Sequence, residues 1–250
     1  MPSLDEFPGV CCIHPLSVDD INYLTWSLLL QIRAELKNTF ASGRTKSIIW
    51  RQQQLLQLAR LVQDNADAVA EAISKDLGKP RFEVFLSEIN LMTQRSIECA
   101  KEIREWTKDE DMSQFNEDWQ GGWIQKARKE LKGVVLIIAY ALLLPITDFL
   151  LTSTIHLRPW NFPLVLSLQP LYGAIAAGCC AVVKMSEIVP SFSRIFAELL
   201  PKYLDNDAFK AIQGSVTEIT RLLELQCASW FYYSMPSYLF FPSTQCLWFH

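Results

Sequence analysis

Three polar residues of the chain could hold a ligand or a developing negative charge. Asn161 follows a buried apolar strand, where its side-chain amide and nearby backbone amides could stabilise an oxyanion. Lys184 ends the next apolar strand and could donate hydrogen bonds to sugar hydroxyls. Glu187 lies three residues further on and could bind the same sugar, for example a ribose. These residue types therefore suggest an oxyanion site and a sugar site at the ends of two strands.

The same residues also have a simpler explanation. Asn161 would cap a helix, and Lys184 would only solvate the end of a strand. Spacing alone favours this simpler explanation, so the residues by themselves leave both open.

The segment Arg158–Glu187, which contains all three residues, has the pattern of a strand–helix–strand crossover. Its helix is predicted over Pro163–Ala177, with Gly178 at its end, and CAVVK follows as a buried strand that ends in Lys184. The polar groups of the segment gather at the strand ends, which is where open α/β sheets bind ligands.

Helical periodicity dominates the first part of the chain. Ile32–Phe40 is predicted to be the end of one helix, and the apolar residues from Trp50 to Val62 recur at the spacing of an amphipathic helix. A second amphipathic helix is predicted to start at Asn65 and to end before Gly78. A long third helix is predicted over Phe82–Trp106.

The pattern changes at Trp123. WIQKARKEL alternates as a half-exposed strand does, and VVLIIA is apolar throughout, as a central strand buried on both faces is. After the crossover we predict a helix beginning near Pro190, a strand over Phe209–Gln213, a turn at Gly214 and a short helix over Val216–Leu225. N-terminal helices followed by alternating strands and helices predict an α/β fold with a partial doubly wound parallel sheet.

Composition excludes several classes of protein. Half of the 250 residues are hydrophobic, a fifth are charged and the net charge is −4, so nucleic acid is not an expected partner. The basic run Lys126–Lys132 is better explained as a solvated strand face. Seven cysteines without a CxxC pair predict neither a metal site nor a disulfide framework, and they favour a reducing, cytoplasmic location. The apolar run Val134–Thr147 is shorter than the roughly 20 residues that a membrane helix needs.

Five segments resemble the aldehyde dehydrogenase family, in particular the branch that includes the fatty aldehyde enzymes. They are, in order, SGRTKSIIWRQQQL, DLGKPRFEVFLSEI, KGVVLIIA, PWNFPLVLSLQPLYGAIAAG and VVKMSE. The resemblance is to the N-terminal half of the family's sequence. It implies a partial NAD(P)-binding domain over residues 32–226, interrupted by an insertion at 140–158, between an unmatched N-terminus (1–31) and an unmatched aromatic tail (227–250). WIQKARKEL would belong to the family's oligomerisation strands.

The resemblance implies roles for individual residues. Asn161 would be the oxyanion-hole amide of the catalytic site, and Lys184 and Glu187 would hold the adenosine ribose of NAD or NADP. The other cofactor-binding residues that it implies are Trp160, Ser186 and Gly214. The family's nucleophilic cysteine, in a Gly-Gln-x-Cys context, and its general-base glutamate lie beyond the matched region. Gln245-Cys246 lacks the glycine, so no cysteine here is predicted to be the nucleophile.

Two segments depart from the family pattern. Tyr140–Arg158 adds nineteen residues between two segments that are contiguous in the family, and the sequence from Cys227 has no counterpart. We interpret both as translated introns. The aromatic tail is predicted to form no element. Three sheet strands are predicted where the family's cofactor domain has about five, so we expect the third strand to have an exposed edge and the chain to be poorly stable.

Two functions therefore compete. The first is NAD(P)-dependent oxidation of aldehydes, medium-chain, long-chain or fatty, to carboxylic acids, by a longer product that could form a homodimer; this chain itself is predicted to be inactive. The second is a non-catalytic fragment that pairs with full-length subunits through its strand unit. A membrane-associated protein is a more distant alternative, and membrane association is compatible mainly with the longer form.

Overall fold

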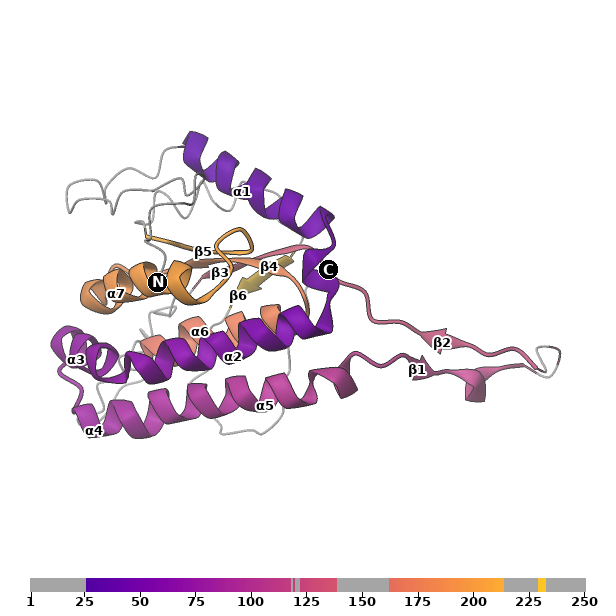
Figure 1. The fold of residues 1–250 in the computed structure, drawn as a ribbon, viewed down its shortest axis with the longest axis horizontal. Coiled ribbons are helices and arrows are strands. Elements are labelled where there is room, and N and C mark those ends of the chain that lie inside the picture. Colours follow the sequence, from indigo (N-terminus) through magenta and orange to yellow (C-terminus); the bar gives the residue numbers. More distant parts are fainter. Residues whose placement is uncertain (1–25, 118, 120–121, 139–161, 214–228, 233–250) are drawn as a thin grey trace, which may run out of the picture.

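A helical N-terminal layer packs against a four-stranded parallel sheet, and a two-stranded arm protrudes from the body (Figure 1). This is a computed structural model, and it describes residues 26–117, 119, 122–138, 162–213 and 229–232. The predicted α/β class, with helices before a parallel sheet, is confirmed.

The N-terminal helices follow the predicted order. They are α1 (Trp26–Ala41), α2 (Ile48–Asp64), α3 (Ala66–Leu77), α4 (Arg81–Val84) and α5 (Asn90–Trp106), with short 3₁₀ turns at Arg44–Lys46 and Ser113–Phe115. The Ser47 hydroxyl caps α2 by accepting a hydrogen bond from the Trp50 N–H (3.4 Å), and Gly78 ends α3 with φ 67°. The boundary at Gly78 is the predicted one.

The predicted long helix over Phe82–Trp106 is interrupted by one wide turn. Phe85–Ile89 forms a π-helical turn between α4 and α5, and Glu88 within it is fully buried. A π turn inserts an extra residue into the helix and changes which side chains face inward. Apolar periodicity alone therefore predicted the extent of this helix but not its buried glutamate.

The sheet has the strand order β5-β4-β3-β6, with every neighbouring pair parallel. The strands are β3 (Val134–Ile138), β4 (Cys180–Lys184), β5 (Phe209–Ile212) and β6 (Ser229–Tyr232). All residues of β3 and β4 are buried, as their continuous apolar sequences predicted. β5 lies at a sheet edge, also as predicted.

Strand β6 corrects the prediction that the aromatic tail forms no element. Ser229–Tyr232 pairs with β3 in register, from Val135 opposite Ser229 to Ile138 opposite Tyr232. Aromatic residues favour strands, and the outer edge of β3 offers unpaired backbone groups to a neighbouring strand. In the part of the chain that the structure describes, the sheet therefore has four strands, one more than the three predicted.

Helices cover both faces of the sheet. The crossover helices are α6 (Pro163–Ala176) and α7 (Pro190–Tyr203), which begin at the predicted prolines. α6 packs on β3 and β4, with α2 and α5 behind it, and α1 lies on the other side of the sheet (Figure 1). Of the helices that the structure describes, none has both the length and the apolar character to cross a membrane. The apolar run from Val134 instead begins as strand β3.

The turn between α6 and β4 requires a glycine. Gly178 has φ 73°, and a Cβ at this position would lie 2.5 Å from the Arg51 guanidinium. The Arg51 side chain is itself buried and donates hydrogen bonds to the carbonyls of Thr45 (2.8 Å), Lys46 (3.1 Å) and Ala176 (3.2 Å). Arg51 thus ties the start of α2 to the end of the crossover helix.

The protruding arm is less regular than predicted. Instead of a half-exposed strand over residues 123–131, only Lys126–Ala127 (β2) pairs, antiparallel, with Glu110–Asp111 (β1), and both strands are exposed. Within the described residues, no layer packs on the arm to select a buried face. The basic run is solvated as predicted, but only Lys126 of it lies on a strand; Lys129 is exposed and pairs with Glu110 at 2.8 Å.

Candidate functional site

The carboxyl ends of the sheet strands lie level with one another. Ile138 of β3 is opposite both Lys184 of β4 and Tyr232 of β6, and Lys184 is opposite Ile212 of β5. The chain passes from β3 through β4 to β5 on one side, and β6 lies on the other side of β3. This reversal of strand order is a topological switch point, beside which open α/β sheets bind ligands.

Lys184 and Glu187 meet at this edge, as the sequence suggested. The Lys184 ammonium is buried and donates a hydrogen bond to Glu187 Oε2 at 2.9 Å, whereas the Glu187 side chain is 43% exposed. Burial alone would raise the pKa of Glu187. The hydrogen bond from Lys184, a backbone hydrogen bond and the lysine charge outweigh burial and lower this pKa. Glu187 is therefore a solvent-accessible carboxylate with unused acceptor capacity.

The turn after β4 is fixed by hydrogen bonds around Ser186. The buried Ser186 hydroxyl accepts a hydrogen bond from the Ile188 N–H (3.1 Å), and the Ser186 carbonyl accepts one from the Ser193 hydroxyl (2.7 Å). Gln213 Nε2 in turn donates to the Ser193 carbonyl at 3.1 Å. Ser186 thus shapes the loop that carries Glu187. The other predicted site residues, Trp160, Asn161 and Gly214, lie outside the described residues.

A second lysine–glutamate pair, which the sequence pattern did not reveal, lies at the start of α6. Lys79 Nζ donates to Glu88 Oε1 at 2.8 Å, and Glu88 Oε2 accepts the Leu164 N–H at 2.9 Å. The Lys79 ammonium also lies 4.0 Å from the centre of the Phe162 ring. Burial raises the pKa of Glu88, and Lys79 together with the amides of Leu164 and Val165 offsets only part of this rise.

Asp76 makes the corresponding contact at the start of α7. Its carboxylate oxygens accept hydrogen bonds from the N–H groups of Ser191 (3.2 Å) and Phe192 (2.9 Å). The residues that precede α6 and α7, Phe162 and Val189, have no capping side-chain hydrogen bond. Both crossover helices are therefore capped from a distance, by carboxylates of the N-terminal helical layer. Sequence spacing could not reveal caps that lie 76 and 115 positions away.

The described cysteines are poor candidates for a nucleophile. Cys99, Cys179 and Cys180 are free and buried, and burial raises the pKa of the Cys99 and Cys180 thiols to about 12. A thiol with so high a pKa carries almost no thiolate at neutral pH. Among the residues that the structure covers, no cluster of His, Cys, Asp and Glu side chains is arranged to hold a metal ion.

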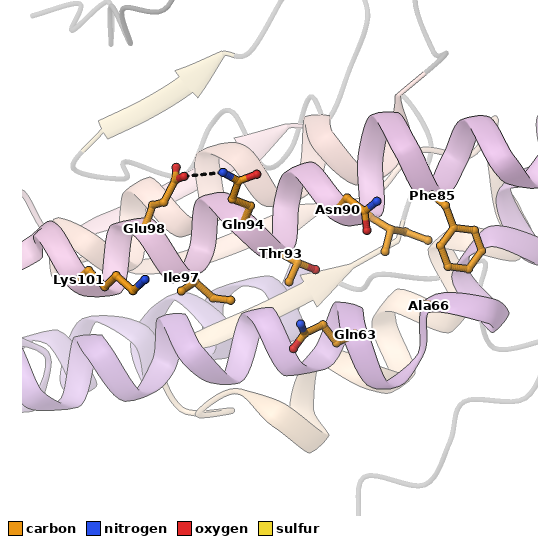
Figure 2. Close-up of a pocket in the computed structure, with 10 residues that line it drawn as sticks. Gln63, Ala66, Phe85, Asn90, Thr93, Gln94, Ile97, Glu98 and Lys101 are labelled. Atoms are coloured by element: carbon orange, nitrogen blue, oxygen red, sulfur yellow. Dashed lines mark hydrogen bonds between the residues drawn. The ribbon is translucent and has the colours of Figure 1, made fainter.

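A groove with a volume of about 480 Å³ runs between α2 and α5 (Figure 2). Its polar lining includes Gln63, Asn90, Thr93, Gln94 and Lys101. Gln94 donates a hydrogen bond to Glu98 along its rim at 2.8 Å. The groove lies between helices and not at the strand ends, so we place the candidate site at the sheet edge that carries Lys184 and Glu187.

Comparisons of sequence point to one family. A model of the aldehyde dehydrogenase family matches residues 151–226, a range that includes Lys184, Ser186 and Glu187. Aldehyde dehydrogenase family 3 member I1, chloroplastic, of Arabidopsis thaliana is 36% identical over 190 residues, which are 76% of this chain and 31% of the relative. Aldehyde dehydrogenase family 3 member B1 of Bos taurus is 39% identical over 191 residues, 76% of this chain and 36% of the relative. The chain thus spans about a third of the length of the curated relatives it matches.

Solved structures agree in fold. A substrate-bound state of Staphylococcus aureus AldH matches with a TM-score of 0.68 and 28% identity, over 79% of this chain and 38% of that one. An NAD⁺ complex of an aldehyde dehydrogenase from Bacillus cereus matches with a TM-score of 0.62 and 21% identity, over 79% of this chain and 36% of that one.

Proposed function

Since the matched three quarters of the chain belong to the aldehyde dehydrogenase family, we propose that this chain carries the adenosine-binding part of an NAD(P) site. In this proposal Lys184 and Glu187 hold the ribose. Trp160, Ser186 and Gly214 line or shape the cofactor cleft, and Asn161 supplies the oxyanion-hole amide of the complete active site.

The Lys184–Glu187 pair at the carboxyl edge of the sheet is the observation that carries the proposal. The pair uses one donor of the ammonium and one oxygen of the carboxylate on each other. Each group therefore keeps hydrogen-bonding capacity for the neighbouring 2′- and 3′-hydroxyls of a ribose, which both donate and accept. Because Lys184 is buried at the end of a strand, its ammonium has little freedom left to lose when a sugar binds.

The charge of Glu187 favours NAD over NADP. A carboxylate accepts hydrogen bonds from a ribose 2′-hydroxyl, whereas it repels a phosphate at the same position. The lowered pKa of Glu187 keeps the side chain ionised at neutral pH, so this discrimination operates under physiological conditions. We therefore expect NAD to bind more tightly than NADP.

The wider activity in this proposal is the oxidation of an aldehyde, medium-chain, long-chain or fatty, to a carboxylic acid by a longer form of the protein. The 250-residue chain would bind the dinucleotide without turning over aldehyde, because its matched region offers no activated thiol. The free thiols of Cys99, Cys179 and Cys180 support a reducing compartment such as the cytoplasm.

A second candidate function is pairing with another subunit through the arm. Trp119, Trp123 and Ile124 are highly exposed there, and the two tryptophan rings pack edge to face with their centres 5.4 Å apart. Exposed aromatic clusters of this kind are typical of protein interfaces. A homodimer, or a complex with a longer aldehyde dehydrogenase subunit, would cover them. Sedimentation velocity tests this proposal: Trp123→Ala should weaken self-association, and a strictly monomeric wild-type chain that also ignores a longer subunit would contradict it.

Calorimetric titration tests the main proposal. NAD and adenosine should bind the wild-type chain, and NADP should bind more weakly. Incubation with NAD and a medium-chain aldehyde should give no NADH absorbance. Absence of adenosine and NAD binding by a folded chain would refute the proposed cofactor site, and turnover would refute the proposal that the chain is inactive.

A further inference from the structure

The N-termini of α6 and α7 lie on the side of the sheet where the strands end, because each helix follows a strand of the parallel sheet. Free N–H groups and the helix dipole at such positions commonly bind the phosphates of nucleotides. Whether these two helices can do so depends on how many of their first N–H groups are available.

The first turn of α6 has no N–H group to offer. Pro163 lacks an N–H, the amides of Leu164 and Val165 are hydrogen-bonded to Glu88, and the Leu166 amide is bonded to the Phe162 carbonyl at 3.0 Å. Glu88 is completely buried, so neither water nor a ligand can replace it without opening the packed core.

The first turn of α7 is occupied in the same way. Pro190 has no N–H, Ser191 and Phe192 donate to Asp76, and the Ser193 amide donates to the Val189 carbonyl at 2.9 Å. The same device thus occurs at both crossover helices: a proline first, then two amides held by a carboxylate from the N-terminal helical layer.

We propose that Asp76 and Glu88 are internal anions that occupy the phosphate-binding positions of α7 and α6, so that these two helices exclude phosphate and the edge beside them selects a ligand by its sugar. A phosphate placed at either helix start would find no free N–H group in the first turn and would lie beside a carboxylate. A ribose at Lys184 and Glu187 needs no help from either helix. The part about the sugar rests on the proposed function, whereas the exclusion of phosphate does not.

Amide chemical shifts of the full chain, labelled with ¹⁵N, test the proposal residue by residue. Titration with inorganic pyrophosphate should leave the amide signals of Leu164, Val165, Ser191 and Phe192 unmoved. Titration with adenosine should shift signals in the loop around Glu187. Saturable shifts of the four helix amides by pyrophosphate would overturn the exclusion of phosphate. If adenosine causes no shift while the pyrophosphate result holds, the cofactor proposal fails and the role of the two carboxylates stands.

Two variants of Asp76 sharpen the test. Asp76→Ala frees the amides of Ser191 and Phe192, so pyrophosphate should now shift them, and AMP should gain about fivefold in affinity relative to adenosine, the usual size of a helix-dipole interaction with an anion. Asp76→Asn is the matched control, because it keeps an oxygen for the amides but removes the charge, and its gain should be smaller. A folded Asp76→Ala chain that remains insensitive to pyrophosphate would contradict the proposal.

Discussion

Two lysine–glutamate pairs of nearly equal length lie in contrasting surroundings. Lys79 and Glu88 are joined at 2.8 Å with side chains that are 6% and 0% exposed. Lys184 and Glu187 are joined at 2.9 Å, but their side chains are 1% and 43% exposed. Contact distance therefore does not distinguish the pairs. They differ in what the carboxylate does with its other oxygen.

We call Lys79–Glu88 the closed pair and Lys184–Glu187 the open pair. In the closed pair, the second oxygen of Glu88 accepts a hydrogen bond from the Leu164 amide, so the pair holds a helix in place. In the open pair, Glu187 presents its carboxylate to solvent, so the pair can accept a ligand. We therefore infer that, of the two buried lysines, only Lys184 has a partner that a ligand could reach. The contrast also predicts that the closed pair governs stability and the open pair governs binding.

The largest expected effect is on stability, at the closed pair. Glu88→Ala should lower the free energy of unfolding by about 3–5 kcal/mol, because it removes the closest partner of buried Lys79 and leaves the Leu164 amide without its acceptor. Urea denaturation measures the loss. Glu187→Ala is the matched control and should cost less, about 1–3 kcal/mol, because it leaves buried Lys184 without its carboxylate but takes no acceptor away from a helix amide. Equal losses at the two positions would erase the distinction between the pairs.

The next largest effect is on binding, at the open pair. Lys184→Met keeps the bulk of the side chain and should leave stability unchanged or slightly raised, because it removes a buried charge. Its affinity for NAD should fall by about 10- to 100-fold, the value of a lost hydrogen bond to a charged group. Calorimetry measures the affinity. The matched variant at the closed pair is Lys79→Met. It should lower the free energy of unfolding but leave the affinity of the folded chain for NAD nearly unchanged. A variant that keeps its stability but loses affinity would contradict this expectation.

Asp76 should have an intermediate effect on stability. Asp76→Ala removes the cap of α7 and should cost about 1 kcal/mol, as loss of a helix N-cap usually does. Thermal unfolding would show a modest fall in Tm. Asp76→Asn keeps one acceptor oxygen where the carboxylate offers two, so it should recover part of this loss; no recovery would show that the cap depends on the charge of Asp76.

The smallest effects concern pH, and they have opposite signs at the two glutamates. The pKa of Glu88 is raised in the folded chain, so its contribution to stability is full below the ordinary value of 4.5 and is lost as the pH rises through the folded pKa. The pKa of Glu187 is lowered, so its contribution is present above 4.5 and is lost as the pH falls through the folded pKa.

Stability profiles measured from acidic to neutral pH would resolve this difference. Glu88→Gln should flatten the loss on the alkaline side of 4.5, and Glu187→Gln should flatten the loss on its acidic side. If the two variants changed the pH dependence of stability in the same way, the different burial of Glu88 and Glu187 would have no effect on it.

The sequence predicted the elements whose signals are local. Pro163 and Pro190 begin the crossover helices, Gly178 ends one of them, and the apolar run from Val134 is a buried strand. Lys184 and Glu187 were candidates because they follow a strand, but only the family resemblance assigned them to a ribose. Their being three residues apart is enough to bring them together.

The features that were missed depend on distant partners. The amphipathic pattern did not predict that Glu88 is buried. Its partner amide belongs to a helix 76 positions away, and a π turn changes which side chains of its own helix point inward. Strand β6 forms by pairing with the edge of β3. The polar residues and prolines around it in the sequence did not indicate this pairing. Conversely, residues 123–131 alternate but form a strand of only two residues, both exposed, and no layer among the described residues packs against them.

The most direct test of the central claim is calorimetric titration of NAD into the wild-type chain, Lys184→Met and Glu187→Gln, each first shown to be folded. We expect saturable binding by the wild-type chain and a clear loss of affinity in both variants, with their unfolding free energies nearly unchanged. Binding that is unaffected by either substitution would show that the ribose is held elsewhere and would contradict the account.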